Sequence, residues 1–151
     1  STRESAAMRR EACALGVSQI SAGSRTNPGG YGADEDSTGQ FQLGDHRSLE
    51  EVVAELAASG YVPSFCTACY RAGRTGKDFM DLAKPGLIKR KCDPNAVTTL
   101  QEYLCDYAGP ATQQAGAQAI IEALDDMEPK TRRNAEKMLG MIRAGRRDIY
   151  C

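Results

Sequence analysis

Apolar residues recur at helical spacing twice within the first sixty residues. Residues 4–15 show this pattern and are followed by Gly16, a common residue after the end of a helix. A second helix is predicted after Ser48, which forms a capping box with Glu51, and it should end at Gly60. Its apolar face consists of Leu49, Val52, Val53 and Leu56. Both segments should therefore be amphipathic helices.

The residues between these helices alternate in a different way. Residues 17–22 (VSQISA) read as a short strand, and residues 23–47 form a long segment rich in glycine, proline, asparagine and acidic residues. Within it, the alternation of residues 41–43 hints at another brief strand. A helix, strand, long loop and helix are the parts of β/α units, and one or two parallel strands cannot form a sheet alone. We therefore expect an α/β region that is incomplete without further chain upstream.

The character of the chain changes after Tyr61, where we place a domain boundary. Residues 63–77 have neither helical nor strand periodicity, but helices are predicted beyond them. The predicted segments are residues 78–84, 100–108, 111–127 and 130–144. Thr99 and Glu102 read as a capping box for the second of these, and the last two resemble a helical hairpin. The predicted fold class is thus α/β followed by a mainly helical domain.

Composition excludes several classes of protein. Hydrophobic residues make up 41% and charged residues 26%, which is typical of a folded globular chain. The net charge of -1 gives no broad field to attract nucleic acid or an anionic membrane. No apolar run is long enough to span a membrane, and the first residues do not form a signal peptide, so we expect a cytoplasmic protein. Six cysteines then indicate metal binding or buried thiols rather than a disulfide framework.

Three of the cysteines have the spacing of a metal site. Cys66 and Cys69 form a CxxC pair, and Cys92 follows on a segment that can fold back toward them. A cubane iron–sulfur cluster held by three cysteines keeps one iron open to an outside ligand. Positive charge near the thiols should lower their pKa values and offset the charge of the cluster. The flanking cations are Arg71, Arg74, Lys89, Arg90 and Lys91.

The spacing alone leaves other interpretations open. A structural zinc site with His46 as fourth ligand would make the chain a zinc-stabilised helical interaction module without catalysis. A thioredoxin-like redox pair is a weaker reading, because the CxxC does not open a clear amphipathic helix. The other cysteines have no spacing partner: Cys13 and Cys105 are expected to be packed thiols, and Cys151 to be incidental.

Several runs of residues carry a resemblance to a known family. The most specific are residues 64–71 (SFCTACYR), 73–76 (GRTG), 79–80 (FM) and 92–96 (CDPNA). They closely resemble the carboxy-terminal domain of the [FeFe]-hydrogenase maturases of the HydG family, radical S-adenosylmethionine (SAM) tyrosine lyases related to the thiamine-pathway tyrosine lyase ThiH. Further matching runs are residues 1–4, 19–25, 44–48, 101–104 and 145–150. The resemblance therefore extends over nearly the whole chain.

The resemblance implies a fold and an activity. Residues 1–61 would be the last β/α units of a TIM (β/α)8 barrel, and residues 62–151 a helical domain that binds an auxiliary [4Fe-4S] cluster with an additional labile iron. In this family the enzyme cleaves tyrosine to p-cresol, carbon monoxide and cyanide, and assembles an Fe(CO)(CN)-cysteine precursor for the hydrogenase H-cluster. Cys66, Cys69 and Cys92 match the three cluster ligands. Tyrosine, cysteine and iron would be substrates, and other maturation proteins partners, with no nucleic acid or membrane involved.

The same resemblance suggests a substrate site and a missing part. Arg3 and Ser21 would follow the seventh and eighth barrel strands, at the barrel mouth, where related lyases bind the carboxylate and amino groups of the amino acid. The three-cysteine motif that binds the radical-generating cluster does not occur in this sequence. We therefore expect the chain alone to be inactive. It would need an amino-terminal barrel half that supplies SAM and a second [4Fe-4S] cluster.

Overall fold

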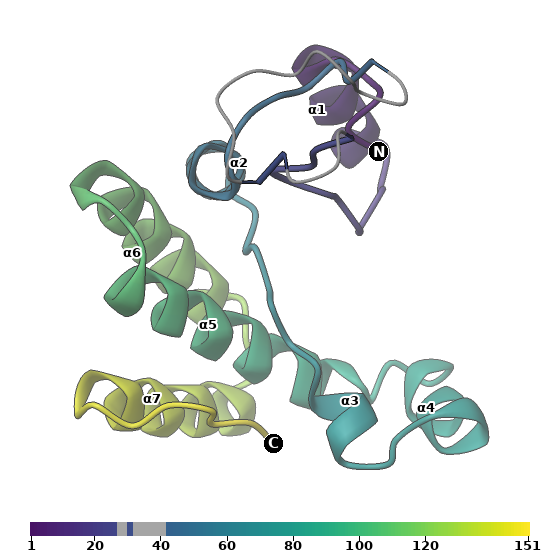
Figure 1. The fold of residues 1–151 in the computed structure, drawn as a ribbon. Helices are drawn as coiled ribbons and strands as arrows, with labels where there is room; N and C mark the ends of the chain where they lie inside the picture. The colour runs from purple at the N-terminus through teal and green to yellow at the C-terminus, as the bar shows by residue number, and fades with distance from the viewer. Residues whose placement is uncertain (27–29, 32–41) are drawn as a thin grey trace. The chain divides into compact units, whose positions relative to one another are not determined.

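In a computed structural model of the chain, residues 1–26, 30–31 and 42–151 are described. The chain divides into two compact units, Ser1–Val52 and Val53–Cys151. The described residues form seven α-helices and no β-strand (Figure 1). The helices are α1 (Ala6–Ala14), α2 (Leu49–Ala58), α3 (Ala68–Arg71), α4 (Gly76–Ala83), α5 (Lys89–Asp106), α6 (Pro110–Asp125) and α7 (Pro129–Arg143).

Local capping signals account for the first two helices. The Ser5 hydroxyl accepts a hydrogen bond from the Met8 amide at 3.3 Å, which fixes the start of α1. At α2 the predicted capping box is confirmed: the Ser48 amide donates to the Glu51 carboxylate at 2.7 Å, and the Glu51 amide donates to the Ser48 hydroxyl at 3.2 Å. Both helices thus begin where side chains satisfy their free amides.

The strand predicted for residues 17–22 is wrong, because this segment has no regular secondary structure. A strand exists only through hydrogen bonds to a neighbouring strand, and none is present among the described residues. Of the brief strand suggested for residues 41–43, Phe41 lies outside the described residues and the next two are irregular. The α/β class therefore does not hold for the part of the chain that the structure describes, which is helical.

Gly44 brings the amino-terminal segment and the residues before α2 into close contact. Its amide donates to the Thr2 carbonyl at 2.9 Å, and a Cβ at this position would lie 2.5 Å from the Arg3 carbonyl oxygen. The close approach of two backbones therefore requires a residue without a side chain.

Helix α5 is the centre of the second unit, because both α6 and α7 pack against it (Figure 1). The interior is apolar, and its most deeply buried members include Val97, Leu100, Ile120, Leu139 and Ile142. The last two helices make few contacts with one another, so they form a three-helix arrangement with α5 rather than an isolated hairpin. Burial of this apolar surface supplies the main stabilisation of the unit.

The capping box predicted at Thr99 and Glu102 is wrong, because α5 runs through both residues. The Thr99 hydroxyl instead donates back to the Ala96 carbonyl at 3.2 Å, as threonines do inside helices. The Glu102 carboxylate accepts from the Asp148 amide at 2.6 Å. The helix begins at Lys89 rather than at residue 100, and Pro94 lies inside it, within the second turn.

The division between the compact units falls within α2, between Val52 and Val53. The assignment of the two parts to a barrel end and a cluster domain stays a prediction. Among the described residues, no helix is both long and apolar enough to cross a bilayer.

Candidate metal centre

Cys66 and Cys69 lie at the start of the short helix α3. Cys66 comes just before the N-cap residue Thr67, and Cys69 is in the helix; both are half-buried. The Ala68 amide donates to the Cys66 sulfur at 3.4 Å, and Ala68 itself is only 2% exposed. This hydrogen bond fixes the position of the Cys66 side chain at the start of α3.

Cys92 comes from a distant part of the sequence, in the first turn of α5. The pKa of its thiol is raised, first by burial of the group and then by the negative charges of Cys69 and Cys66. Cys92 as a whole is exposed, which limits the effect of burial. The electrostatic effect of both other thiols on Cys92 indicates that Cys92 lies near them.

The flanking cations do not act on Cys92 as predicted. Of the five cations, Arg74 contributes to lowering the pKa of the Cys92 thiol. Burial and the neighbouring charges raise this pKa by more, so the net shift is upward. Arg71 forms an ion pair with Asp148, and Arg90 lies 3.3 Å from Glu128. Their charges are thus partly balanced by carboxylates, a pairing that sequence cannot reveal.

The segment before Cys66 is fixed directly on α5. The Phe65 ring stacks on Tyr103 with centroids 5.1 Å apart, and the Phe65 amide donates to the Thr99 hydroxyl at 3.2 Å. Stacked aromatic rings and a hydrogen bond together define how this segment approaches the helix. They fix the residue just before the CxxC pair on the helix that carries Cys92.

The donor set fits a thiolate-bound cluster in its chemistry, although it is not in ligating geometry. Within the described residues, no three His, Cys, Asp or Glu side chains are arranged to hold a metal ion. The charge of Arg74 acts on Cys92. The buried Nε atom of Arg74 has no hydrogen-bond partner in the part of the chain that the structure describes. A cluster would bring sulfur acceptors to this guanidinium, and three thiols are the donors such clusters take.

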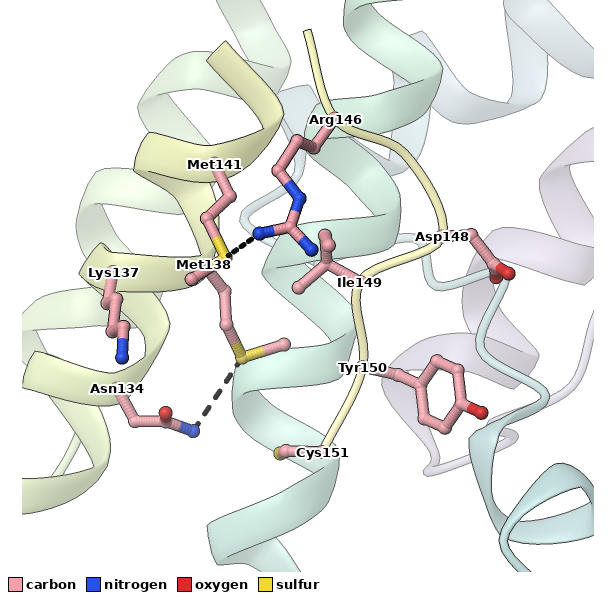
Figure 2. A pocket seen from close by; sticks show the side chains of 9 residues that line it. All are labelled: Asn134, Lys137, Met138, Met141, Arg146, Asp148, Ile149, Tyr150 and Cys151. Atoms are coloured by element: carbon pink, nitrogen blue, oxygen red, sulfur yellow. Dashed lines mark hydrogen bonds between the residues drawn. The ribbon is translucent and has the colours of Figure 1, made fainter. Parts of the chain in front are cut away.

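Residues 146–151 run from the end of α7 to the candidate centre, and sequence reasoning missed their role. Arg146 and residues 148–151 line a surface pocket of about 320 Å³ together with residues of α7 such as Met138 and Met141 (Figure 2). Cys151, expected to be incidental, lies at the end of this segment, and its sulfur is 3.8 Å from the Lys91 carbonyl. Residues 145–150 are one of the runs that carry the family resemblance, but their spacing from the cysteines does not predict this position.

The remaining cysteines and His46 differ in their exposure to solvent. Cys13 is half-buried and Cys105 is exposed, so the prediction that Cys105 is a packed thiol is wrong. His46 is exposed and belongs to the other compact unit. Its role as the fourth ligand of a zinc site stays an alternative prediction.

Arg3 and Ser21, the predicted substrate-binding residues, are both exposed in the first unit. Asp45 and Arg9 hold the segments that contain these two residues. The Asp45 amide donates to the Thr2 carbonyl at 3.1 Å, and the Arg9 guanidinium donates to the Ser21 carbonyl. Arg9 also forms a buried ion pair with Asp45. Sequence reasoning missed this network, since a charged residue on a helix is normally solvated.

The pKa of Asp45 is held well below its usual range, chiefly by a side-chain hydrogen bond from Arg47. Burial opposes this shift, and the charge of Arg9 adds to it. The Arg47 guanidinium lies 2.8 Å from the carboxylate, which is 1% exposed. A carboxylate between two guanidinium groups thus fixes the local structure around Thr2 and Ser21.

Comparison with known proteins shows that the first part of the chain is similar to a domain of biotin and thiamin synthesis proteins. Residues 1–62 match the model of the Biotin and Thiamin Synthesis associated domain. Over 63 residues the chain is 41% identical to 2-iminoacetate synthase of Salmonella typhimurium (strain LT2) and to that of Escherichia coli (strain K12). Each match covers 42% of this chain and 17% of the synthase.

One solved structure is similar to nearly the whole chain. The chain is similar to the crystal structure of HydG, a maturase of the [FeFe]-hydrogenase, with a TM-score of 0.91 and 43% identity. The match covers 99% of this chain and 33% of the HydG chain. The resemblance to the carboxy-terminal part of HydG is thereby confirmed. The chain spans one third of HydG and a smaller share of the two synthases.

Proposed function

We propose that this chain is the carboxy-terminal part of a radical SAM tyrosine lyase and that Cys66, Cys69 and Cys92 hold its auxiliary [4Fe-4S] cluster. The observation that carries the proposal is that α3 and the first turn of α5 bring these thiols into one neighbourhood. The similarity to HydG over 99% of the chain supports the same assignment. Three thiolates leave one iron of such a cluster without a protein ligand.

The residues around the thiols have distinct roles in this proposal. When bound, the cluster supplies an open iron position at which an additional iron with carbon monoxide and cyanide can be gathered. The Ala68 amide orients the Cys66 sulfur, while the Arg74 guanidinium offsets negative charge beside Cys92. The product would be an Fe(CO)(CN)-cysteine unit delivered to the H-cluster of an [FeFe]-hydrogenase.

Substrate binding belongs to the first unit. Arg3 and Ser21 would bind the carboxylate and amino groups of tyrosine, and the exposure of both side chains supports this role. The Arg9–Asp45 pair would fix both segments, through Ser21 and through the carbonyl of Thr2. Arg9 and Asp45 thus act as positioning residues behind the two contacts.

Radical generation would lie outside this chain. An amino-terminal barrel half would bind SAM and a second [4Fe-4S] cluster, cleave tyrosine and release p-cresol. Cysteine and iron would be further substrates, and other hydrogenase maturation proteins would be partners. We therefore expect the 151-residue chain to bind a cluster but not to turn over tyrosine.

Metal analysis of the full chain tests the proposal. After anaerobic reconstitution with iron and sulfide we expect about four irons and four sulfides per chain. Cys92→Ala should abolish the electron paramagnetic resonance signal of the reduced cluster. Cys105→Ala, which removes an exposed thiol on the same helix, is the matched control and should retain it. Stoichiometric zinc without any cluster signal would instead support the zinc-stabilised interaction module.

A further inference from the structure

Residues 146–151 are held along α5 by a carboxylate in the carboxy-terminal half of this helix. The Glu102 side chain accepts from the Asp148 amide at 2.6 Å and from the Ile149 amide at 3.3 Å. Asp148 has φ +63, a left-handed conformation that few residues other than glycine, asparagine and aspartate adopt. Such a backbone persists where surrounding contacts fix it, so this position is determined by its partners.

The end of the segment is fixed beside the candidate centre. The Cys151 amide donates to the Asn95 side-chain oxygen at 2.9 Å, and the Asn95 amide group donates back to the Cys151 carbonyl at 3.2 Å. The Arg74 guanidinium donates to the same carbonyl at 2.7 Å. Asn95 is 1% exposed and lies three residues after Cys92, on the same helix. Asn95 therefore acts as a template for the backbone of the segment.

The segment also binds the residues that follow Cys69. The Arg71 guanidinium makes a two-point contact with the Asp148 carboxylate, one bond of which is 2.7 Å long. The same guanidinium lies over the Tyr150 ring at 4.5 Å from the centroid. Paired hydrogen bonds and a cation–π contact define the orientation of a guanidinium more closely than either alone.

These contacts connect the two elements that carry the cysteines. Ahead of Cys66, the chain is tied to α5 directly through Phe65. Beyond Cys69, the contacts of Arg71 and Arg74 described above run to residues 148–151, which are in turn bound to Asn95 and Glu102 of α5. A three-cysteine cluster needs both elements at a fixed separation, because its ligand sulfurs come from each of them.

We propose that residues 146–151 form a clamp that holds α3 in register with the first turn of α5, with Asp148, Arg71 and Asn95 as positioning residues for the three thiols. This inference rests on the proposed function in so far as the clamped thiols are cluster ligands. The clamp would slow the loss of iron from the site without contributing a ligand of its own.

The first test compares Asp148→Asn with Asp125→Asn in the full chain. Asparagine tolerates the left-handed backbone but removes the charge that pairs with Arg71. Asp125 pairs with Arg132 at a similar exposure, 64% and 42% against 64% and 43% for Asp148 and Arg71, but at another site. Outer partners of ligands commonly alter metal affinity by about tenfold or more, so we expect iron release to a chelator to be about threefold to tenfold faster in Asp148→Asn. Asp125→Asn should match the wild type, and equal rates in both variants would overturn the clamp.

The second test needs no metal and separates this proposal from the proposed function. In the metal-free chain, hydrogen exchange of residues 66–76 should be several-fold faster in Asp148→Asn and in Asn95→Ala, while the amides of α6 and α7 keep their protection. If the wild type takes up no cluster, the proposed function fails, and this comparison still decides whether the clamp exists. Unchanged exchange of residues 66–76 in Asp148→Asn, which is at the surface and should fold, would refute it.

Discussion

Different forces stabilise the interior of each of the two compact units. In Ser1–Val52 the buried residues include the ion pair of Arg9 and Asp45, while large apolar side chains such as Leu15 and Val17 are 89% and 52% exposed. In Val53–Cys151 the interior is a continuous apolar cluster around α5. An apolar cluster tolerates imperfect geometry better than a buried ion pair, which depends on every partner. We therefore expect the first unit to be the less stable of the two.

The largest effect should come from Asp45→Asn. This change leaves the Arg9 guanidinium buried without its counter-ion, and breaking a buried pair in this way costs about 3–5 kcal/mol. Hydrogen exchange should show loss of protection in α1, with α5 to α7 unaffected. Glu11→Gln, which alters an exposed carboxylate of the same helix, is the control. Retained protection of α1 in Asp45→Asn would show that apolar contacts dominate this unit as well.

A somewhat smaller effect is expected from Leu139→Ala in the second unit. Leu139 is 2% exposed in the core, and a large-to-small change there costs about 3 kcal/mol in the free energy of unfolding. Urea unfolding followed by circular dichroism should detect this loss. Ile121→Ala, at a residue of α6 that is 53% exposed, should change stability by about 0.5 kcal/mol or less. Equal losses in the two variants would argue against the core described above.

The smallest expected effect is the pH dependence of the first unit, which should come from Asp45. The folded pKa of Asp45 lies below its ordinary value near 4, so its ion pairs contribute fully above that value. Their contribution declines as the pH falls below about 4, toward the folded pKa. Protection of α1 should therefore decrease on acidification in the wild type more than in Asp45→Asn, which has no carboxylate to titrate. The same acid dependence in both proteins would rule out Asp45 as the cause.

Local signals explain why much of the helical structure could be predicted. The capping box at Ser48, the glycine after α1 and the prolines at the starts of α6 and α7 are short-range features that the sequence shows directly. The same kind of signal misled at Thr99, because a capping-box pattern inside a longer helix has no free amide to satisfy. Residues 17–22 failed for the opposite reason, since strand formation depends on a partner elsewhere.

The cysteines of the candidate centre could be predicted from their spacing in the sequence. The CxxC pair and Cys92 were found from sequence, and the structure brings them into one neighbourhood, although their role as ligands stays a prediction. The contacts of Asn95 with Cys151 and of Arg71 with Asp148 join residues more than fifty positions apart. No periodicity or motif relates such residues, so only the fold could reveal them.

The close backbone contact at Gly44 has a practical consequence for anyone who alters this molecule. Even an added methyl group would collide with main-chain atoms of Arg3 and Glu4, which cannot rotate away as a side chain would. Position 44 is therefore a poor place for a label, a crosslinker or a library codon, whereas a reporter that needs to sense displacement of the first few residues could be designed around it.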